Sequence, residues 1–209
     1  MPRLTMAAAA RGMGMKGRRA GAAKTARPLL PGLAPGLRPP RDPEEHAAEL
    51  SPLLRAWFAE SSRDLPWRVN YTPYEVWISE VMLQQTQMDR AVDYFRRWMA
   101  QLPDVAALAA ASEETVLRLW EGLGYYSRAR NLMAAARRIV AKHGGVFPER
   151  EEDIRALPGV GPYTAAAVAS IAFGRPVACV DANVERVLSR LFDVETSVRR
   201  EPAASFLRQ

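Results

Sequence analysis

The spacing of apolar residues is the feature that most constrains this fold, because they recur every three or four positions from Asp42 onward. The last such series is Val184, Val187, Leu188 and Leu191. This spacing is typical of helices that bury one face, and no segment alternates with period two for long enough to indicate a strand. The sequence therefore predicts an all-α fold with short loops and no internal repeat.

Several helix ends can be predicted from capping residues. We expect the first helix to begin at Ser51, since Pro52 suits the first helical position. Another helix should follow Ser112, and Gly144 and Gly145 should stop the next one. Shorter helices are expected over residues 106–110, 153–157 and 163–173. The apolar faces are defined by Leu53, Leu54, Trp57 and Phe58; Tyr74, Trp77, Ile78, Val81 and Gln85; Met88, Val92, Phe95 and Met99; Val116, Leu117, Leu119 and Trp120; and Leu132, Ala136, Ile139 and Val140.

Residues 1–41 differ in composition from the rest of the chain. They hold nine Lys or Arg, no acidic residue and no aromatic residue. So little apolar surface cannot offset the entropy lost on ordering, so we predict a disordered basic leader. Three interpretations remain open: a plain basic extension, which we favour, an organelle transit peptide, or a start codon assigned too early, since Met6, Met13 and Met15 are in frame.

The net charge of +6 belongs to this leader, because the other 168 residues carry 20 basic and 23 acidic side chains. Binding of a polyanion by the folded part must therefore come from local sites. The single cysteine, Cys179, excludes a disulfide framework and a multi-cysteine metal site built by this chain alone. No apolar run approaches the roughly 20 residues that cross a bilayer, so no membrane span is expected.

A glycine-rich turn in residues 157–165 is the first candidate site. Gly159 and Gly161 allow a tight hairpin between two helices, the second of which we expect Thr164 to open. Backbone N–H groups around Gly159, Val160, Gly161 and Thr164 would then face outward and could bind a phosphodiester without reading its sequence. An ordinary packing joint between helices is the alternative.

Two carboxylates are the second candidate. Asp181 precedes an amphipathic helix and fits an N-cap, a position that keeps a carboxylate ionised. Glu80 lies mid-helix among apolar residues, where partial burial would raise its pKa and keep it available as an acid. A solvated surface side chain is the alternative for Glu80. The neutral amides that follow, within residues 84–87, can donate to and accept from base edges.

Six segments together resemble the helix-hairpin-helix DNA glycosylases of the endonuclease III superfamily, and most closely the adenine glycosylases of the MutY type. They are residues 63–68, 73–87, 120–131, 144–145, 157–165 and 180–190. The resemblance covers about residues 50–195. It implies a six-helix barrel domain over residues 73–180 with its hairpin at 157–164. Residues 42–72, a helix and linker, and residues 181–209 would belong to a second, incomplete helical domain.

The resemblance also implies roles for single residues. Glu80 would protonate the adenine ring and later activate water, and Asp181 would stabilise the sugar oxocarbenium ion. Tyr163 and Asn183 would support this pair through hydrogen bonds. In the endonuclease III branch a lysine matches Tyr163 and forms a Schiff base, which a tyrosine cannot do. A monofunctional glycosylase is therefore expected; thymine-mismatch glycosylases carry a similar hairpin, but the segment around Glu80 favours adenine.

The expected partner is double-stranded DNA with adenine opposite 8-oxoguanine or guanine, bound by a monomer that flips the adenine out of the stack. By resemblance, the base pocket and the wedge consist of Arg63, Leu65, Trp67, Arg68, Leu83 and Gln85. Tyr125 and Tyr126 are expected either to pack between helices, which we favour, or to face DNA. The enzyme would act inside the cell, in the bacterial cytoplasm, or in the nucleus or mitochondrion of a eukaryote.

Relatives in this family continue with four cysteines that hold a [4Fe-4S] cluster and then a domain for 8-oxoguanine, and this sequence has neither. We therefore expect a fragment or a truncated product. We also expect a poorly covered apolar face on the helix that bears Leu54, Trp57 and Phe58. The alternative function is a catalytically inactive, truncated module that still binds DNA through its hairpin.

Overall fold

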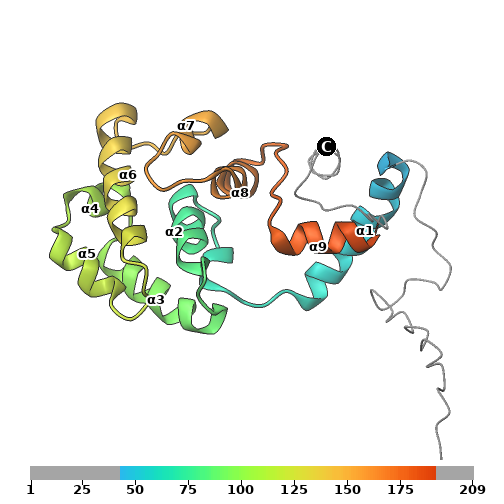
Figure 1. Ribbon diagram of the computed structural model, residues 1–209, viewed down its shortest axis with the longest axis horizontal. Coiled ribbons are helices and arrows are strands. Elements are labelled where there is room, and N and C mark those ends of the chain that lie inside the picture. The colour runs from blue at the N-terminus through green and yellow to red at the C-terminus, as the bar shows by residue number, and fades with distance from the viewer. Residues whose placement is uncertain (1–42, 192–209) are drawn as a thin grey trace, which may run out of the picture. The chain divides into compact units, whose positions relative to one another are not determined.

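A computed structural model describes residues 43–191, and within this range every regular element is a helix. The all-α prediction is thus confirmed for the described residues (Figure 1). The leader at 1–41 and the stretch from 192 to 209 lie outside them. The elements are α1 (Pro43–Ser61), η1 (Pro66–Arg68), α2 (Pro73–Leu83), α3 (Met88–Gln101), α4 (Val105–Ala110), α5 (Glu113–Trp120), α6 (Ser127–His143), α7 (Glu151–Arg155), α8 (Pro162–Phe173) and α9 (Ala182–Leu191).

Local capping explains most helix ends. The Thr72 hydroxyl accepts from the Glu75 N–H at 3.2 Å, and the Glu75 carboxylate accepts from the Thr72 N–H, which makes a capping box for α2. Ser112 caps α5 as predicted, and Gly144 ends α6 with a φ of 61°. The start predicted at Ser51 was wrong: α1 begins at Pro43 and runs through Pro52.

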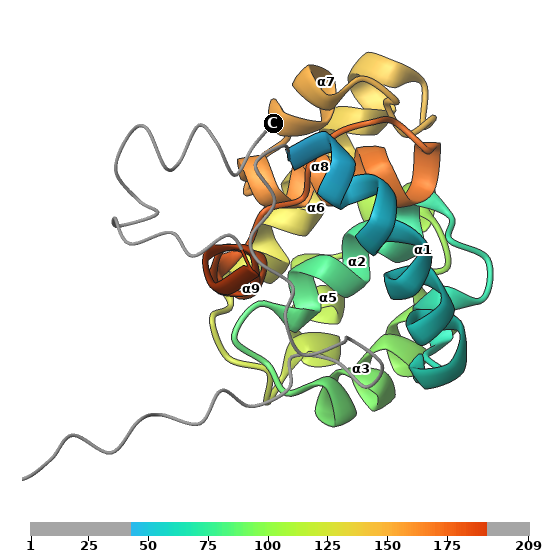
Figure 2. The same cartoon turned by 90° about the vertical axis from the view of Figure 1, so that its right-hand side faces the viewer.

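The core lies where α2, α3, α5, α6 and α8 meet. Helix α8 packs on α2 and on α7, whereas α6 packs on α4 and α5 (Figures 1 and 2). Trp77, Trp98 and Trp120 are completely buried, and the Trp98 indole N–H donates to the Tyr74 hydroxyl at 3.0 Å. That hydroxyl donates in turn to the Leu102 carbonyl at 2.8 Å, and the Trp120 indole N–H donates to the Gly124 carbonyl at 3.0 Å. The buried indole N–H of Trp77 has no hydrogen-bond partner among the described residues.

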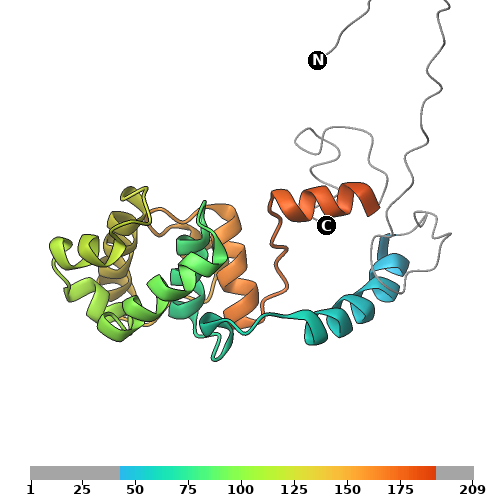
Figure 3. The ribbon, with the colours of Figure 1, turned by 90° about the horizontal axis from the view of Figure 1, so that it is seen from below.

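Helices α1 and α9 contribute little to this core. The exposed fractions of Leu54, Trp57 and Phe58 are 41%, 47% and 45%, which confirms the predicted uncovered face of α1. In α9 no residue is buried, and Val187 is 53% exposed. Figure 3 shows α2 and α8 lying side by side, while neither α1 nor α9 has a comparable helical neighbour. Over the described residues, no helix combines the length and the apolar character needed to cross a membrane.

Three further predictions about side-chain placement were wrong. Gln85 does not share the apolar face of α2, since that helix ends at Leu83 and Gln85 has a φ of 56°. Tyr125 does not pack between helices, because 63% of it is exposed, and Tyr126 is 40% exposed. Val140 was expected on the buried face of α6 and is also exposed.

Candidate active site

Glu80 lies in the last turn of α2, and most residues of this helix are buried. Val76, Ser79 and Val81 surround it in the sequence and are each less than 5% exposed, whereas Glu80 itself is partly buried. The capping box at Thr72 and the contact of α2 with α8 fix this helix in place. A carboxyl group is thereby held at the edge of the core.

Tyr163 reaches this carboxyl from the start of α8. Gly161 is the N-cap of α8 and Pro162 its first residue, so the hairpin presents Tyr163 in the first helical turn. The Tyr163 hydroxyl lies close enough to the Glu80 carboxyl for each group to shift the pKa of the other. Residues 83 positions apart in the sequence therefore meet at the interface of α2 with α8.

Asp181 is the N-cap of α9, as its position in the sequence predicted. Its Oδ1 accepts from the N–H groups of Asn183 and Val184 at 3.0 and 2.8 Å. Its Oδ2 accepts from the Asn183 side-chain amide at 2.9 Å, and the Asn183 oxygen accepts from Arg186 at 2.7 Å. Both carboxylate oxygens are thus oriented by donors on α9.

The protonation of Glu80 and Tyr163 reflects this clustering. Burial raises the pKa of Glu80 above its ordinary value; the nearby Tyr163 hydroxyl opposes that shift, and the negative charge of Asp181 adds to it. Burial also raises the pKa of Tyr163, and the charges of Glu80 and Asp181 raise it further. The site therefore combines a carboxyl that holds its proton to higher pH, a neutral phenol and a second carboxylate.

A small cavity opens beside Glu80. Its volume is about 120 Å³. Its walls consist of Glu80 and other side chains of α2, one side chain each from α3 and α8, and residues of the segment before α2. Of the predicted pocket residues, Trp67, Arg68 and Leu83 line it. The other lining residues are Tyr71, Val76, Ser79, Met88 and Ile171.

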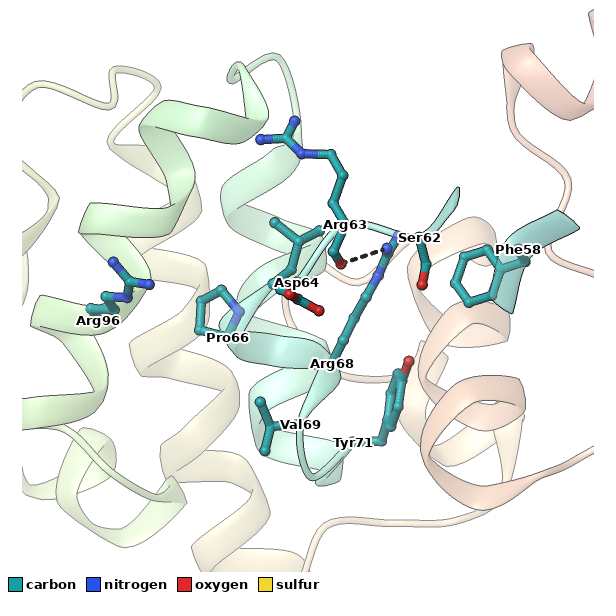
Figure 4. Close-up of a pocket in the computed structure, with 10 residues that line it drawn as sticks. Phe58, Ser62, Arg63, Asp64, Pro66, Arg68, Val69, Tyr71 and Arg96 are labelled. Carbon is teal, nitrogen blue, oxygen red and sulfur yellow. Dashed lines mark hydrogen bonds between the residues drawn. The ribbon is translucent and has the colours of Figure 1, made fainter. Parts of the chain in front are cut away.

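A larger hollow of about 390 Å³ adjoins this cavity and shares Arg68 and Tyr71 with it. The predicted pocket residues Arg63 (Figure 4) and Leu65 line the larger hollow rather than the cavity at Glu80. Arg68 donates to the Arg63 carbonyl at 3.3 Å, as the dashed line in Figure 4 marks. Gln85, the predicted wedge, lines neither space.

The hairpin takes the tight form that its two glycines predicted. Gly159 has a φ of 73°, and a side chain there would meet Asn131 of α6 at 2.5 Å. The Val160 N–H is not free, since it donates to the Leu157 carbonyl at 3.2 Å. Thr164 does not open α8; it lies in the first turn with its side chain buried, and its hydroxyl accepts from Gln84 at 3.4 Å. Contact between this hairpin and DNA stays a prediction.

Two residues near this site were not singled out from the sequence. Tyr71, which lines both spaces, has a φ of 51°, and an isolated positive φ leaves no pattern in a single sequence. Arg128 is only 9% exposed although it is an arginine. It stands four residues before Leu132 on the buried side of α6, so a charge on an apolar face was the signal that could have found it.

The residues of this chain do not fit a [4Fe-4S] cluster. Such clusters are held by four thiolates, and the sequence contains one cysteine. Cys179 lies near Glu80, and burial raises the pKa of its thiol, which disfavours the thiolate that a metal would need. Among the described residues, no three His, Cys, Asp or Glu side chains gather in a way that could hold a metal ion.

The chain matches one known protein family. Residues 78–208, more than half of the chain, match the model of the HhH-GPD superfamily base excision DNA repair proteins. This range contains Glu80, the hairpin with Tyr163, and Asp181.

Individual relatives agree with this match. The chain is 46% identical to the adenine DNA glycosylase of Rattus norvegicus over 163 residues, which are 74% of this chain and 31% of the relative. It thus spans about a third of that protein's length. Among solved structures, a thermostable thymine-DNA glycosylase is similar with a TM-score of 0.70 and 25% identity, over 78% of this chain and 77% of that one. The structure of a trapped endonuclease III–DNA covalent intermediate is similar with a TM-score of 0.63 and 26% identity, over 75% of this chain and 73% of that one.

Proposed function

We propose that this chain, which belongs to the HhH-GPD superfamily of base excision DNA repair proteins, is a monofunctional DNA N-glycosylase. Its substrate would be adenine mispaired with 8-oxoguanine or guanine in double-stranded DNA. The similarity to the adenine DNA glycosylase of Rattus norvegicus supports adenine as the base, and the similarity to the endonuclease III–DNA complex supports DNA as the ligand. Such an enzyme acts in whichever compartment holds the DNA.

The observation that carries this proposal is the meeting of Glu80, Tyr163 and Asp181. Three segments far apart in the sequence bring together a proton-holding carboxyl, a neutral phenol and an oriented second carboxylate. Cleavage of a glycosidic bond uses this division of labour: one acid protonates the leaving group, and one anion faces the developing cation.

The steps follow from these groups. Glu80 gives its proton to a ring nitrogen of the flipped adenine, and the bond between that base and the sugar C1′ breaks with both electrons leaving on adenine. Asp181 stabilises the oxocarbenium ion on the sugar. The ionised Glu80 then takes a proton from water as the water oxygen bonds to C1′, which regenerates the acid and leaves an abasic site. Asn183 holds Asp181 by a hydrogen bond, and Tyr163 lies beside Glu80 to support it.

The cavity at Glu80 supports a pocket for the base. Its walls combine the aromatic ring of Trp67, the guanidinium of Arg68 and the apolar side chain of Leu83, which suit a flat heteroaromatic ring. At about 120 Å³ it is smaller than the 300–1,000 Å³ usual for ligand pockets. Entry of adenine therefore requires displacement of lining side chains, and the partly exposed Arg68 and Tyr71, which also border the larger hollow, have room to move.

A single-turnover assay on a duplex with one adenine opposite 8-oxoguanine tests this function. The wild-type chain should release adenine, and Glu80→Gln should slow release by about 10²–10⁴-fold, the usual contribution of a general acid. Glu75→Gln is the matched control, since it lies on the same helix and glutamine also completes a capping box. Binding of the duplex without release of adenine by the wild-type chain would refute the proposal in favour of a DNA-binding module.

A further inference from the structure

Arg128, at the start of α6, makes more hydrogen bonds to backbone carbonyls than any other described side chain. Its guanidinium is buried and donates from Nη1 and Nη2 to five carbonyl oxygens. From Nη1 the acceptors are Val81 at 2.8 Å, Met82 at 3.2 Å and Gln84 at 2.7 Å; from Nη2 they are Leu123 at 3.2 Å and Gly124 at 3.1 Å. One side chain therefore ties the end of α2 to the loop between α5 and α6.

Each of these two loops presents a backbone conformation that non-glycine residues rarely adopt. Gln85 follows the Gln84 carbonyl that Nη1 binds, and its φ is 56°. Tyr125 follows the Gly124 carbonyl that Nη2 binds, and its φ is 49°. Both side chains are exposed. Left-handed residues of this kind persist only where the surroundings hold them, and they gather at functional sites.

The guanidinium is suited to hold both peptides at once. It is planar and presents a rigid fork of donors, whereas an ammonium has three donors around one nitrogen. Its Cζ lies 5.1 Å from the Trp120 ring centroid and 5.7 Å from that of Tyr125, so a ring at the end of α5 and a ring on the loop that follows also position it. Arg128 further borders a cavity of about 90 Å³ together with Gly159 of the hairpin. Arg128 thus binds the end of α2 and the loop between α5 and α6, and it borders the hairpin before α8.

We propose that Arg128 is a positioning residue that clamps the loops of Gln85 and Tyr125, so that both side chains can enter the base stack when a base leaves it. This inference rests on the proposed function. An exposed aromatic ring and a neutral amide on two rigid, neighbouring turns offer a stacking surface and a hydrogen-bonding group to unstacked bases. Glu80 lies four residues before Gln84 on α2, so the clamp sets these side chains relative to the acid.

The first test compares Arg128→Met and Arg128→Lys with Arg137→Met. Arg137 is the matched control, because it also lies on α6 and donates to the carbonyls of Ala109 and Ala111 at 3.2 and 3.3 Å, away from the site. Unstacking is read from the fluorescence of 2-aminopurine placed in the duplex beside the mispaired adenine. Both Arg128 variants should lose most of the fluorescence rise and slow single-turnover excision about 10²-fold, as expected for small misplacements, while Arg137→Met retains both.

The second test asks whether the clamp acts through the two loops. Gln85→Ala and Tyr125→Ala should each slow excision in the wild-type background and add less than about twofold when combined with Arg128→Met, because groups that act as a unit are not additive. Arg128→Lys replaces Arg128→Met in these combinations if the methionine variant does not fold. A folded Arg128 variant with the fluorescence rise and the excision rate of the wild-type chain would overturn the proposal. Full additivity of the effects of the loop substitutions and the Arg128 substitution on excision would overturn it as well. If the wild-type chain excises nothing, the proposed function fails, and the fluorescence comparison alone decides on the clamp.

Discussion

Gly159→Ala is the substitution whose effect follows most directly from the geometry of the hairpin. An alanine Cβ at this position would stand 2.5 Å from Asn131 Cβ, 2.6 Å from Nδ2 and 2.8 Å from Cγ. The amide could rotate away, but Asn131 Cβ is fixed by the backbone of α6. The hairpin or the helix must therefore shift.

Two costs combine in this variant. The φ of 73° places an L-residue in the left-handed region, which costs about 1–2 kcal/mol. Overpacking against a neighbour that cannot retreat typically costs a further 1–3 kcal/mol or so. Together they predict a loss of about 2–5 kcal/mol, or a fall in melting temperature of about 4–20 °C at 2–4 °C per kcal/mol.

Thermal unfolding followed by circular dichroism measures this loss. Gly161→Ala is the control in the same turn, since its φ is −87° and a Cβ there meets nothing within 4 Å. It should change the unfolding free energy by less than about 1 kcal/mol, because the lower entropy of the unfolded chain opposes the poorer N-cap that alanine provides for α8. Asn131→Ala should restore only part of the stability of Gly159→Ala, because the closest atom, Cβ, remains. A fall of less than about 2 °C for Gly159→Ala would show that this reasoning is wrong.

Three further predictions concern the carboxyl groups and Tyr163. Since burial raises the pKa of Glu80, its protonated form favours folding, and this contribution is lost as the pH rises through the native pKa. Glu80→Gln should therefore melt above the wild-type chain at pH 7 and together with it below pH 4.5; equal melting at both would contradict the shift. Asp181→Asn should keep its cap and its melting temperature yet lose about 10²-fold or more in excision rate, and retained activity would argue against a charge role. Borohydride should trap no protein–DNA adduct with the wild-type chain, because Tyr163 has no amine, and efficient trapping would refute a monofunctional enzyme.

The helical class and most helix ends were accessible from the sequence because they depend on local chemistry. The Ser112 cap, the left-handed Gly144 and the turn at Gly159 each follow from what one residue can do with its own backbone. The start of α1 was misjudged because Ser51 and Pro52 carry a local signal that the helix overrides. Propensity is a weak prior when neighbouring residues favour helix on both sides.

The site was less accessible, since it depends on contacts between distant segments. Glu80 and Asp181 were selected from the chemistry of their positions, but only the fold brings Tyr163, on α8, next to Glu80, on α2. Gln85 was misplaced because the helical spacing continues past Leu83, whereas the Arg128 guanidinium binds the last carbonyls of α2 and turns the chain. A long-range hydrogen bond of this kind leaves no periodic trace in the sequence.

The unequal burial of the helices has a consequence for heat inactivation. Glu80 belongs to a helix packed into the tryptophan-rich core, whereas Asp181 caps α9, a helix without a buried residue. Local opening is easiest where apolar contacts are few, so α9 should fray while the core is still folded. Warming would then separate Glu80 from Asp181, the carboxylate proposed to face the sugar cation, before the cooperative transition, and excision should fail at a lower temperature than the one at which tryptophan fluorescence reports melting.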